Sequence, residues 1–345
     1  MLSLGFDKSV CVEYLFPNIL KKIEQIENVV NKTPKNATLS VNPNSEKVFF
    51  ITKQIEGRIV DKNQLLNDII EKYQSKKPLT IQVKTITLTP EIKQEDFEKF
   101  SHKRGDFSTS ISSSSADRKH NVKNALVRLN KQEIYPNQVF SFNKIIGKRT
   151  KENGYRKAKI IMDNEFVNGI GGGVCQVSST LYNTALLAGL EIVEANKHSK
   201  QVGYVKYGFD AMVNFGTSDL KFRNNTQEKL TIITNYSDST ARIRIFGESM
   251  HGISYKLENQ IISSTPAKEE VLIDTSGKYK EKVVFEDEYF YLKKPTNGME
   301  IKSYRKKMKD GECLSIELLR FDKFKVQDAI KVVGAKKRSD EQSVA

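Results

Sequence analysis

Apolar residues recur at helical spacing in two stretches of the first hundred residues. In the first, residues 18–30, five of them fall on one face of a helix: Ile19, Leu20, Ile23, Ile26 and Val30. The second covers residues 61–74, where Asp61 precedes the apolar pattern and is a candidate N-cap. The spacing therefore predicts two amphipathic helices.

Segments rich in β-branched and aromatic residues surround the second helix. They are residues 47–53, 57–61 and 80–89, and Thr89-Pro90 ends the last of them. Such runs are typical of short strands. We expect residues 1–107 to form a small α+β module.

Residues 108–116 contain the run STSISSSS, which offers almost nothing to a hydrophobic core. Serine-rich chain is flexible in isolation. The sequence therefore predicts a disordered linker and a domain boundary here.

The next segment, residues 117–250, mixes both periodicities. An amphipathic helix is expected at 120–134, with Val122, Ala125, Leu126 and Leu129 on one face. Residues 157–169 and 229–247 resemble hairpins, the first turning at Asp163-Asn164. Between them, a helix is expected to begin after a glycine run and to stop at Gly189.

The last third of the chain shows alternating patterns, such as Val283 and Phe285 with charged neighbours. Residues 260–334 are expected to form a small all-β module. Residues 335–345 lack a run of large apolar residues, and a disordered tail is expected. The predicted fold class is a multidomain α+β protein: a small α+β N-terminal module, a central α+β domain and a small all-β C-terminal module.

Composition narrows the function classes. Lys and Arg number 56 against 42 Asp and Glu, a formal net charge of +14. This excess suits an anionic partner, or simply a solvated lysine-rich surface. The basic residues are interspersed with acidic ones and form no stripe with aromatics, so nucleic-acid binding is not favoured.

Cysteine count and hydropathy exclude further classes. Three cysteines, Cys11, Cys175 and Cys313, are too few and too widely spaced for a disulfide scaffold or a Cys-only zinc site. No apolar stretch is long enough to span a bilayer as a helix. Because the first twenty residues show no secretory signal, the sequence as it stands favours the cytosol.

The most informative stretch is the glycine loop at 169–173 and the helix that follows it. Cys175 falls in the first turn of that helix, where free N–H groups and the helix dipole favour a thiolate. Backbone N–H groups near Gly173–Gln176 could stabilise an oxyanion. The alternatives are a small buried cysteine, a phosphate loop and a dinucleotide loop, although the last two lack their usual companion residues.

A nucleophilic cysteine needs a base, and four histidines are available. His198 follows Cys175 by 23 residues, and Asp210 and Asp219 are candidates to orient it. A lone histidine in a basic loop is usually exposed at the surface, so spacing alone supports this Cys–His–Asp set only weakly. No cluster has the spacing of metal ligands, so no metal site is expected.

The residues around Cys175 resemble the VanW family. The resemblance covers about residues 117–248 and rests on GGGVCQVSSTLYNTALLAGL, the HS of KHSK, the YV of GYVKYG, the DA of FDAMV and DLKFRN. The chain departs from the usual pattern at Phe209 and at Lys200-Gln201. These departures affect substrate contacts and remove no candidate catalytic group.

Both flanks resemble modules that accompany this family. Residues 45–100 are similar to a peptidoglycan-binding module, and residues 262–334 are similar to the G-five module. The combination implies a bacterial cell-envelope location. The implied partners are peptidoglycan stem peptides and glycan, with anionic wall polymers as a further possibility and no nucleic acid.

Some VanW domains act as thiol L,D-transpeptidases, so the resemblance implies a possible enzyme. In that case Cys175 is the nucleophile, His198 the base and acid, and Asp210 the residue that orients His198. The resemblance places five further residues at the substrate or oxyanion: Gly172, Gly173, Gln176, Ser178 and Ser199. It implies no cofactor. Hydrolysis through the same intermediate and a non-catalytic wall-binding or accessory role remain open.

Overall fold

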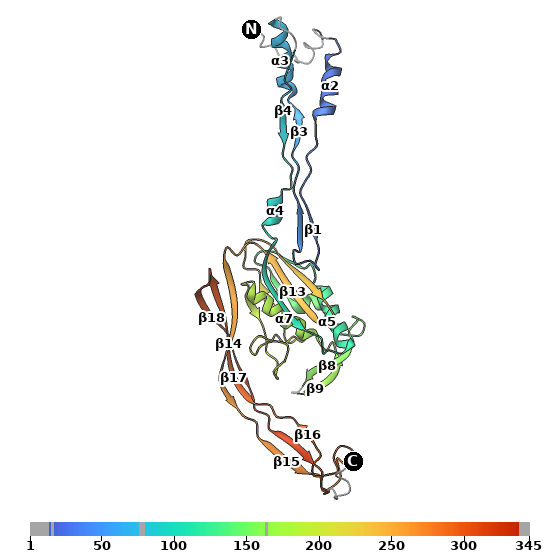
Figure 1. Ribbon diagram of the computed structural model, residues 1–345, viewed down its shortest axis with the longest axis vertical. Coiled ribbons are helices and arrows are strands. Elements are labelled where there is room, and N and C mark those ends of the chain that lie inside the picture. Colours follow the sequence, from blue (N-terminus) through green and yellow to red (C-terminus); the bar gives the residue numbers. More distant parts are fainter. Residues whose placement is uncertain (1–13, 15–16, 76–79, 163–164, 338–345) are drawn as a thin grey trace. The chain divides into compact units, whose positions relative to one another are not determined.

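The computed structural model describes residue 14 and residues 17–75, 80–162 and 165–337 (Figure 1). The chain divides into two compact units, residues 1–99 and residues 100–345, and each is described by itself.

The first unit pairs two helices with two small antiparallel two-stranded sheets. Helix α2 spans Ile19–Val30 and α3 spans Lys62–Gln74. The two-stranded sheets join β1 (Thr38–Val41) to β2 (Phe49–Thr52), and β3 (Gly57–Val60) to β4 (Thr85–Leu88). A short α4 (Gln94–Glu98) follows.

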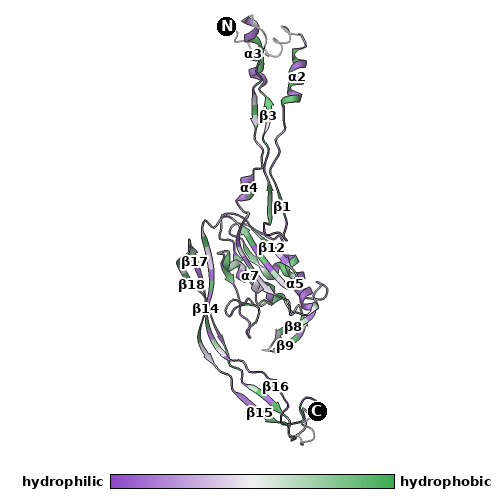
Figure 2. Ribbon diagram, viewed as in Figure 1, coloured by the Kyte–Doolittle hydropathy of each residue, from purple (hydrophilic) through white to green (hydrophobic). Residues whose placement is uncertain are grey.

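Both helices predicted in this unit are confirmed. Helix α2 carries hydrophilic and hydrophobic residues along its length (Figure 2), and its apolar residues pack with Val60 and Leu65. The carboxylate of Asp61 accepts a hydrogen bond of 3.0 Å from the backbone N–H of Gln64, so Asp61 is the N-cap of α3.

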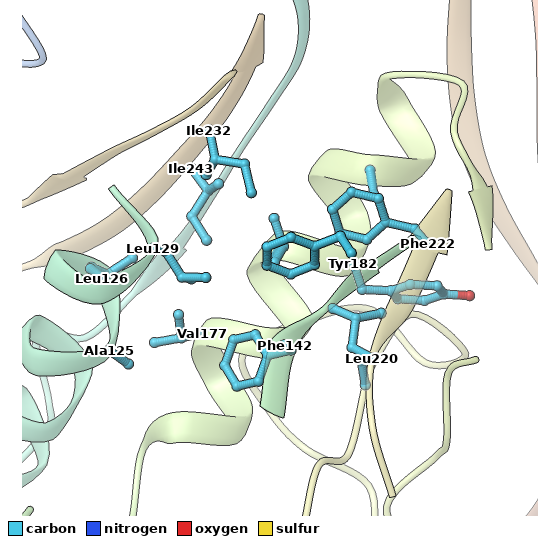
Figure 3. Close-up of a cluster of buried hydrophobic side chains, with 14 of the residues drawn as sticks. Ala125, Leu126, Leu129, Phe142, Val177, Tyr182, Leu220, Phe222, Ile232 and Ile243 are labelled. Carbon is cyan, nitrogen blue, oxygen red and sulfur yellow. The ribbon is translucent and has the colours of Figure 1, made fainter. Parts of the chain in front are cut away.

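The second unit is built on an antiparallel sheet of order β5-β13-β12-β6. Its strands are β5 (His102–Ser110), β6 (Glu133–Ile134), β12 (Leu230–Tyr236) and β13 (Thr240–Gly247). Helix α5 (Ala116–Leu129) contacts β12, and α7 (Val174–Leu187) contacts β5 and β13. The side chains of these helices and strands converge on one core, including Leu126, Leu129, Val177, Ile232 and Ile243 (Figure 3).

The expected serine-rich linker at 108–116 is wrong, because these residues are part of this sheet and its helix. Ser108 and Thr109 pair with β13, and the Thr109 hydroxyl lies 2.9 Å from that of Thr180 in α7. Ile111 is fully buried, and Ser115 caps α5. The hydroxyl of Thr109 is accommodated in β5 because Thr180 and Gln176 of α7 are its hydrogen-bond partners, while the backbone of β5 pairs with β13.

A second, three-stranded sheet of order β10-β11-β7 lies in the same unit. It contains β7 (Val139–Ser141), β10 (Glu191–Glu194) and β11 (Lys221–Arg223), and α6 (Phe142–Ile146) follows β7. The predicted hairpin is formed by β8 (Lys157–Met162) and β9 (Glu165–Ile170). Its predicted turn, Asp163-Asn164, lies outside the described residues.

Helix α7 ends where the sequence predicts. Gly189 has a φ of +75°, its N–H donates to Leu186, and the N–H of Leu190 donates to Ala185. These two bonds are those of a Schellman motif, which needs a left-handed residue at the helix end. A Cβ at Gly189 would also lie 2.4 Å from the ring of Tyr255, so glycine is required twice over.

The C-terminal region is all β, which confirms the expected α+β class with an all-β end. One sheet has the order β14-β17-β18, from β14 (Ile253–Thr265), β17 (Gly298–Lys309) and β18 (Glu312–Phe324). The other has the order β15-β19-β16, from β15 (Glu269–Ile273), β16 (Tyr289–Lys293) and β19 (Ala329–Val333).

Two expected limits of this region differ from the structure. The β structure begins at Ile253 rather than at residue 260, because β14 pairs with β17 along its whole length. Lys336, expected in a disordered tail, exchanges backbone hydrogen bonds with Val284 and Glu286, while residues 338–345 lie outside the described part. Among the described residues, no helix has the length and apolarity that crossing a membrane requires.

Substitution of Ile111 by alanine tests whether this segment is part of the fold. Because the side chain is fully buried, Ile111→Ala should lower the free energy of unfolding by about 2–5 kcal/mol. Urea unfolding of the full chain measures it, with the exposed Ser113→Ala as the control. Equal free energies of unfolding for Ile111→Ala and Ser113→Ala would instead support a flexible linker at this segment.

Candidate active site

Cys175 lies in the first turn of α7, directly after a glycine loop. Gly173 is the N-cap of the helix, with a φ of +108° that favours glycine. A Cβ on Gly172 would lie 2.6 Å from the carbonyl oxygen of Lys159 in β8. The loop therefore passes flush against β8 and delivers Cys175 at the positive end of the helix.

The thiol of Cys175 is half-buried and has two polar neighbours. Its Sγ lies 3.5 Å from the carbonyl oxygen of Val213, and it interacts with the side chain of His198. Burial raises the pKa of the Cys175 thiol, but the interaction with His198 and the charge of Arg149 outweigh it. The net pKa of Cys175 is lowered, which favours a thiolate.

His198 is held by Asp210, and both side chains are nearly fully buried. The Nδ1 of His198 lies 2.6 Å from Oδ2 of Asp210, and the backbone N–H of His198 donates to the same oxygen at 2.7 Å. Burial lowers the pKa of His198, but its bonds to Asp210 and Cys175 raise that pKa to about 9. With Nδ1 engaged by Asp210, Nε2 is the nitrogen left for the thiol.

The other carboxylate considered from sequence has a different task. Asp219 accepts hydrogen bonds from the hydroxyl of Ser141 at 2.6 Å and from the backbone N–H of Asn143 at 2.8 Å. It thereby fixes the start of α6. The structure brings Cys175, His198 and Asp210 together and leaves Asp219 outside that set.

Two arginines that the sequence reasoning missed lie near the thiol. Arg149 and Arg118 both interact electrostatically with Cys175. Arg149 donates to Oδ1 of Asn143 at 2.8 Å, while its Nε and Nη1 are buried without a hydrogen-bond partner among the described residues. A guanidinium with unused N–H groups beside a thiol stabilises negative charge there.

Two of the predicted substrate or oxyanion residues make hydrogen bonds within the fold. The backbone N–H of Gln176 already donates to Gly173 at 3.0 Å, and its side chain bridges Arg118 and Ser110. Ser178 is fully buried and donates to the carbonyl oxygen of Ala211 at 2.6 Å. Both side chains are therefore used up in fixing α7 within the core.

The remaining predicted positions stay predictions. Gly172 and Gly173 form the loop in front of Cys175, and Ser199 is exposed next to His198. Tyr204, which was not singled out, is hydrogen-bonded to Ser179 and interacts with Cys175; burial raises the pKa of Tyr204. Tyr204 lies in the YV pair of GYVKYG, one of the motifs that carry the VanW resemblance, so the sequence did contain a signal for this residue.

Among the described residues, Cys175 belongs to no candidate metal cluster and does not line the cleft between β10 and β18. In the described parts of the chain, no group of three or more His, Cys, Asp or Glu residues could hold a metal ion. A cleft of about 360 Å³ lies between β10 and β18, where it is lined by residues such as Glu191, Glu194, Glu317 and Arg320, and Cys175 is not among them.

Comparison with known proteins matches two family models. Residues 117–246 match the family described as "VanW like protein", and residues 12–82 match "Putative peptidoglycan binding domain".

Two curated relatives are similar over part of their length. The chain is 32% identical over 216 residues to Uncharacterized protein YoaR of Bacillus subtilis, covering 61% of the chain and 68% of YoaR. It is 28% identical over 145 residues to Vancomycin B-type resistance protein VanW of Enterococcus faecalis, covering 40% and 52%. The chain thus spans about two thirds of the first relative and half of the second.

Two solved structures align with about a quarter of the chain. The HP0197-G5 crystal structure shares 22% identity at a TM-score of 0.14, covering 24% of the chain and 97% of that structure. The IgA1 protease G5 domain structure shares 16% identity at a TM-score of 0.17, covering 25% and 92%.

Removal of the Arg149 charge should make the thiol less acidic. Because that charge favours the thiolate, we expect Arg149→Met to raise the pKa of Cys175. The ultraviolet absorbance of the thiolate, taken as a difference from Cys175→Ser, measures the pKa. The control is Arg156→Met, since Arg156 is an exposed partner of Asp117. An unchanged thiol pKa in Arg149→Met would contradict the assignment.

Proposed function

The chain belongs to the VanW family, and from that premise we propose that it acts on peptidoglycan in the bacterial cell envelope as a thiol-dependent L,D-transpeptidase. The match of residues 12–82 to a peptidoglycan-binding model supports the substrate class. The name of the Enterococcus relative, a vancomycin resistance protein, supports a location in the cell envelope, outside the cytoplasm.

The observation that carries the proposal is the connected set Cys175, His198 and Asp210. Asp210 is hydrogen-bonded to His198, His198 interacts with Cys175, and the thiol lies at the start of a helix. A cysteine with a lowered pKa, a histidine beside it and a carboxylate behind that histidine is the arrangement used in covalent acyl transfer. A thiol with only a structural role needs neither partner.

The first half-reaction would acylate the enzyme. The Cys175 thiolate attacks the carbonyl carbon of the third residue of a stem peptide, in the amide bond that joins this residue to the D-residue. As the tetrahedral intermediate collapses, the C–N bond breaks and the imidazolium of His198 gives its proton to the departing amine of the D-residue. A thioacyl bond then joins the stem peptide to Cys175.

The second half-reaction would transfer the peptide. The side-chain amine of a third residue in a neighbouring stem attacks the thioacyl carbon, and His198 accepts the proton that the amine loses. The C–S bond breaks, the thiolate is restored, and the new amide joins two third residues. Throughout, the positive end of α7 and the charge of Arg149 favour the developing negative charge.

Replacement of Cys175 tests the covalent step. Incubated with a synthetic stem tetrapeptide that ends in a D-residue, the wild-type chain should gain the mass of a thioacyl adduct and release the D-residue. Cys175→Ala should do neither, because no sulfur remains to form the bond. Mass spectrometry of the intact protein and of the peptide products follows both.

The products also separate the related activities. A cross-linked dimer indicates transpeptidation, and a shortened, uncross-linked stem indicates hydrolysis through the same adduct. Binding of the stem peptide without adduct or product by the wild type would instead indicate a non-catalytic wall protein. If Cys175→Ala still forms the cross-linked dimer, the assignment of Cys175 as the nucleophile is wrong.

Replacement of His198 tests the base. Loss of positioned general acid–base catalysis costs typically about 10²–10⁴ in rate, so His198→Ala should slow acylation by about that factor. The His198→Ala variant should remain folded, with an unfolding midpoint close to that of the wild type. Single-turnover adduct formation measures the rate, with His102→Ala, an exposed histidine at the start of β5, as the control. Equal rates in His198→Ala and wild type would remove His198 from the mechanism.

A further inference from the structure

We propose that Arg320 of the C-terminal β region is a positioning residue for the active site, so that the site is complete only in a chain that carries β18. The proposal rests on the proposed thiol chemistry of Cys175 and goes beyond it. It assigns a role in that chemistry to a segment outside the matched VanW region, which ends at residue 246.

Arg320 engages the side of Asp210 that His198 leaves free. Oδ2 of Asp210 accepts from both the ring and the backbone of His198. Oδ1 accepts from Nη2 of Arg320 at 2.7 Å, and Nη1 of Arg320 donates to the backbone carbonyl oxygen of Asp210 at 3.0 Å. Two points of contact fix both the carboxylate and the main chain of the residue that holds it.

Arg320 is itself fixed in place by its own strand. Its Nε donates to Oδ2 of Asp322 at 2.8 Å, and residues 320 and 322 project from the same face of β18. The Asp322 side chain is 2% exposed and the Arg320 side chain 14%. A guanidinium held between two buried carboxylates has little freedom to leave Asp210.

This contact decides the charge of a buried carboxylate. Burial raises the pKa of Asp210, but hydrogen bonds from His198 and the charge of Arg320 outweigh it and lower the net pKa. Without Arg320, Oδ1 would be buried without this partner, which costs free energy unless the group takes up a proton or rotates. A protonated or rotated Asp210 holds the imidazolium of His198 less well, and the thiolate loses its partner.

Several other titratable groups face this cluster from the elements packed around it. They are Tyr182 of α7, Tyr204, Asp322 of β18, and Lys197, which interacts with Asp322. Burial raises the pKa of Tyr182 to about 12, and it also raises the pKa of Tyr204. Of the groups on β18, Arg320 is the one that bonds to Asp210. Its removal should therefore change the acid side of the pH profile of Cys175 reactivity.

The chain provides a matched control in Arg305. This residue of β17 also reaches from the β region to the VanW domain, where its Nη1 donates to the carbonyl oxygen of Leu190 at 2.7 Å. Leu190 follows the end of α7, so the bond does not involve Asp210. Arg305→Met removes one arginine from the same interface, together with its ion pair to Glu317, and leaves the contacts of Asp210 in place.

The test is the rate of iodoacetamide alkylation of Cys175 in the full chain as a function of pH. Mass spectrometry of the Cys175 peptide keeps the other cysteines out of the measurement. In Arg320→Met, the acid limb of the profile should move up by about one pH unit, so that alkylation below it is about tenfold slower. Arg320→Lys should shift less, and Arg305→Met should match the wild type.

Two outcomes would overturn the proposal. One is an acid limb that stays in place in Arg320→Met, and the other is an equal shift in Arg305→Met, which would indicate loose docking of the β region. If circular dichroism shows that Arg320→Met is unfolded, the same test is made with Arg320→Lys, which keeps the positive charge but cannot make both contacts with Asp210. An acid limb that stays in place in Arg320→Lys would then overturn the proposal. Alkylation requires no peptidoglycan, so a chain without transpeptidase activity could still show the shift.

Discussion

The structure of the candidate site depends on keeping the buried carboxylate of Asp210 ionised. A charge out of water is tolerated only when several donors surround it. Here the donors are the ring and backbone of His198 on one oxygen and Arg320 on the other. Through these bonds the side chain of Asp210 joins three segments: the loop after β10, its own segment before β11, and strand β18. The same bonds fix the orientation of the His198 ring that faces the thiol.

The start of α7 supplies the second half of the site. Because Gly172 and Gly173 let the chain pass against β8, Cys175 emerges at the helix N-terminus rather than inside the core. Gln176 and Ser178 then anchor the same turn with hydrogen bonds to Ser110 and Ala211. The residues around the nucleophile are thus divided between those that hold the helix and those that face the thiol.

Much of this could be predicted from the sequence because the signals are local. The amphipathic spacing of α2 and α3, the glycine that ends α7 and the place of Cys175 in its first turn are all confirmed. What failed needed long-range information. Residues 108–110, Ser-Thr-Ser, looked like a flexible linker because their partners, on β13 and α7, are distant in sequence. Arg320 lies 110 residues beyond Asp210, and nothing in its neighbourhood marks it. Gln176 and Ser178 lie in the right motif, yet only the fold shows that their bonds are already used.

In the proposed site, a thiolate of Cys175 faces an imidazolium of His198 that is supported by an ionised Asp210. ¹⁵N NMR of the His198 ring nitrogens across a pH series follows their protonation state and tests this arrangement. Both nitrogens should carry protons at neutral pH, and the ring should titrate with a pKa of about 9. A neutral ring at neutral pH, with a pKa near that of a free histidine, would contradict it.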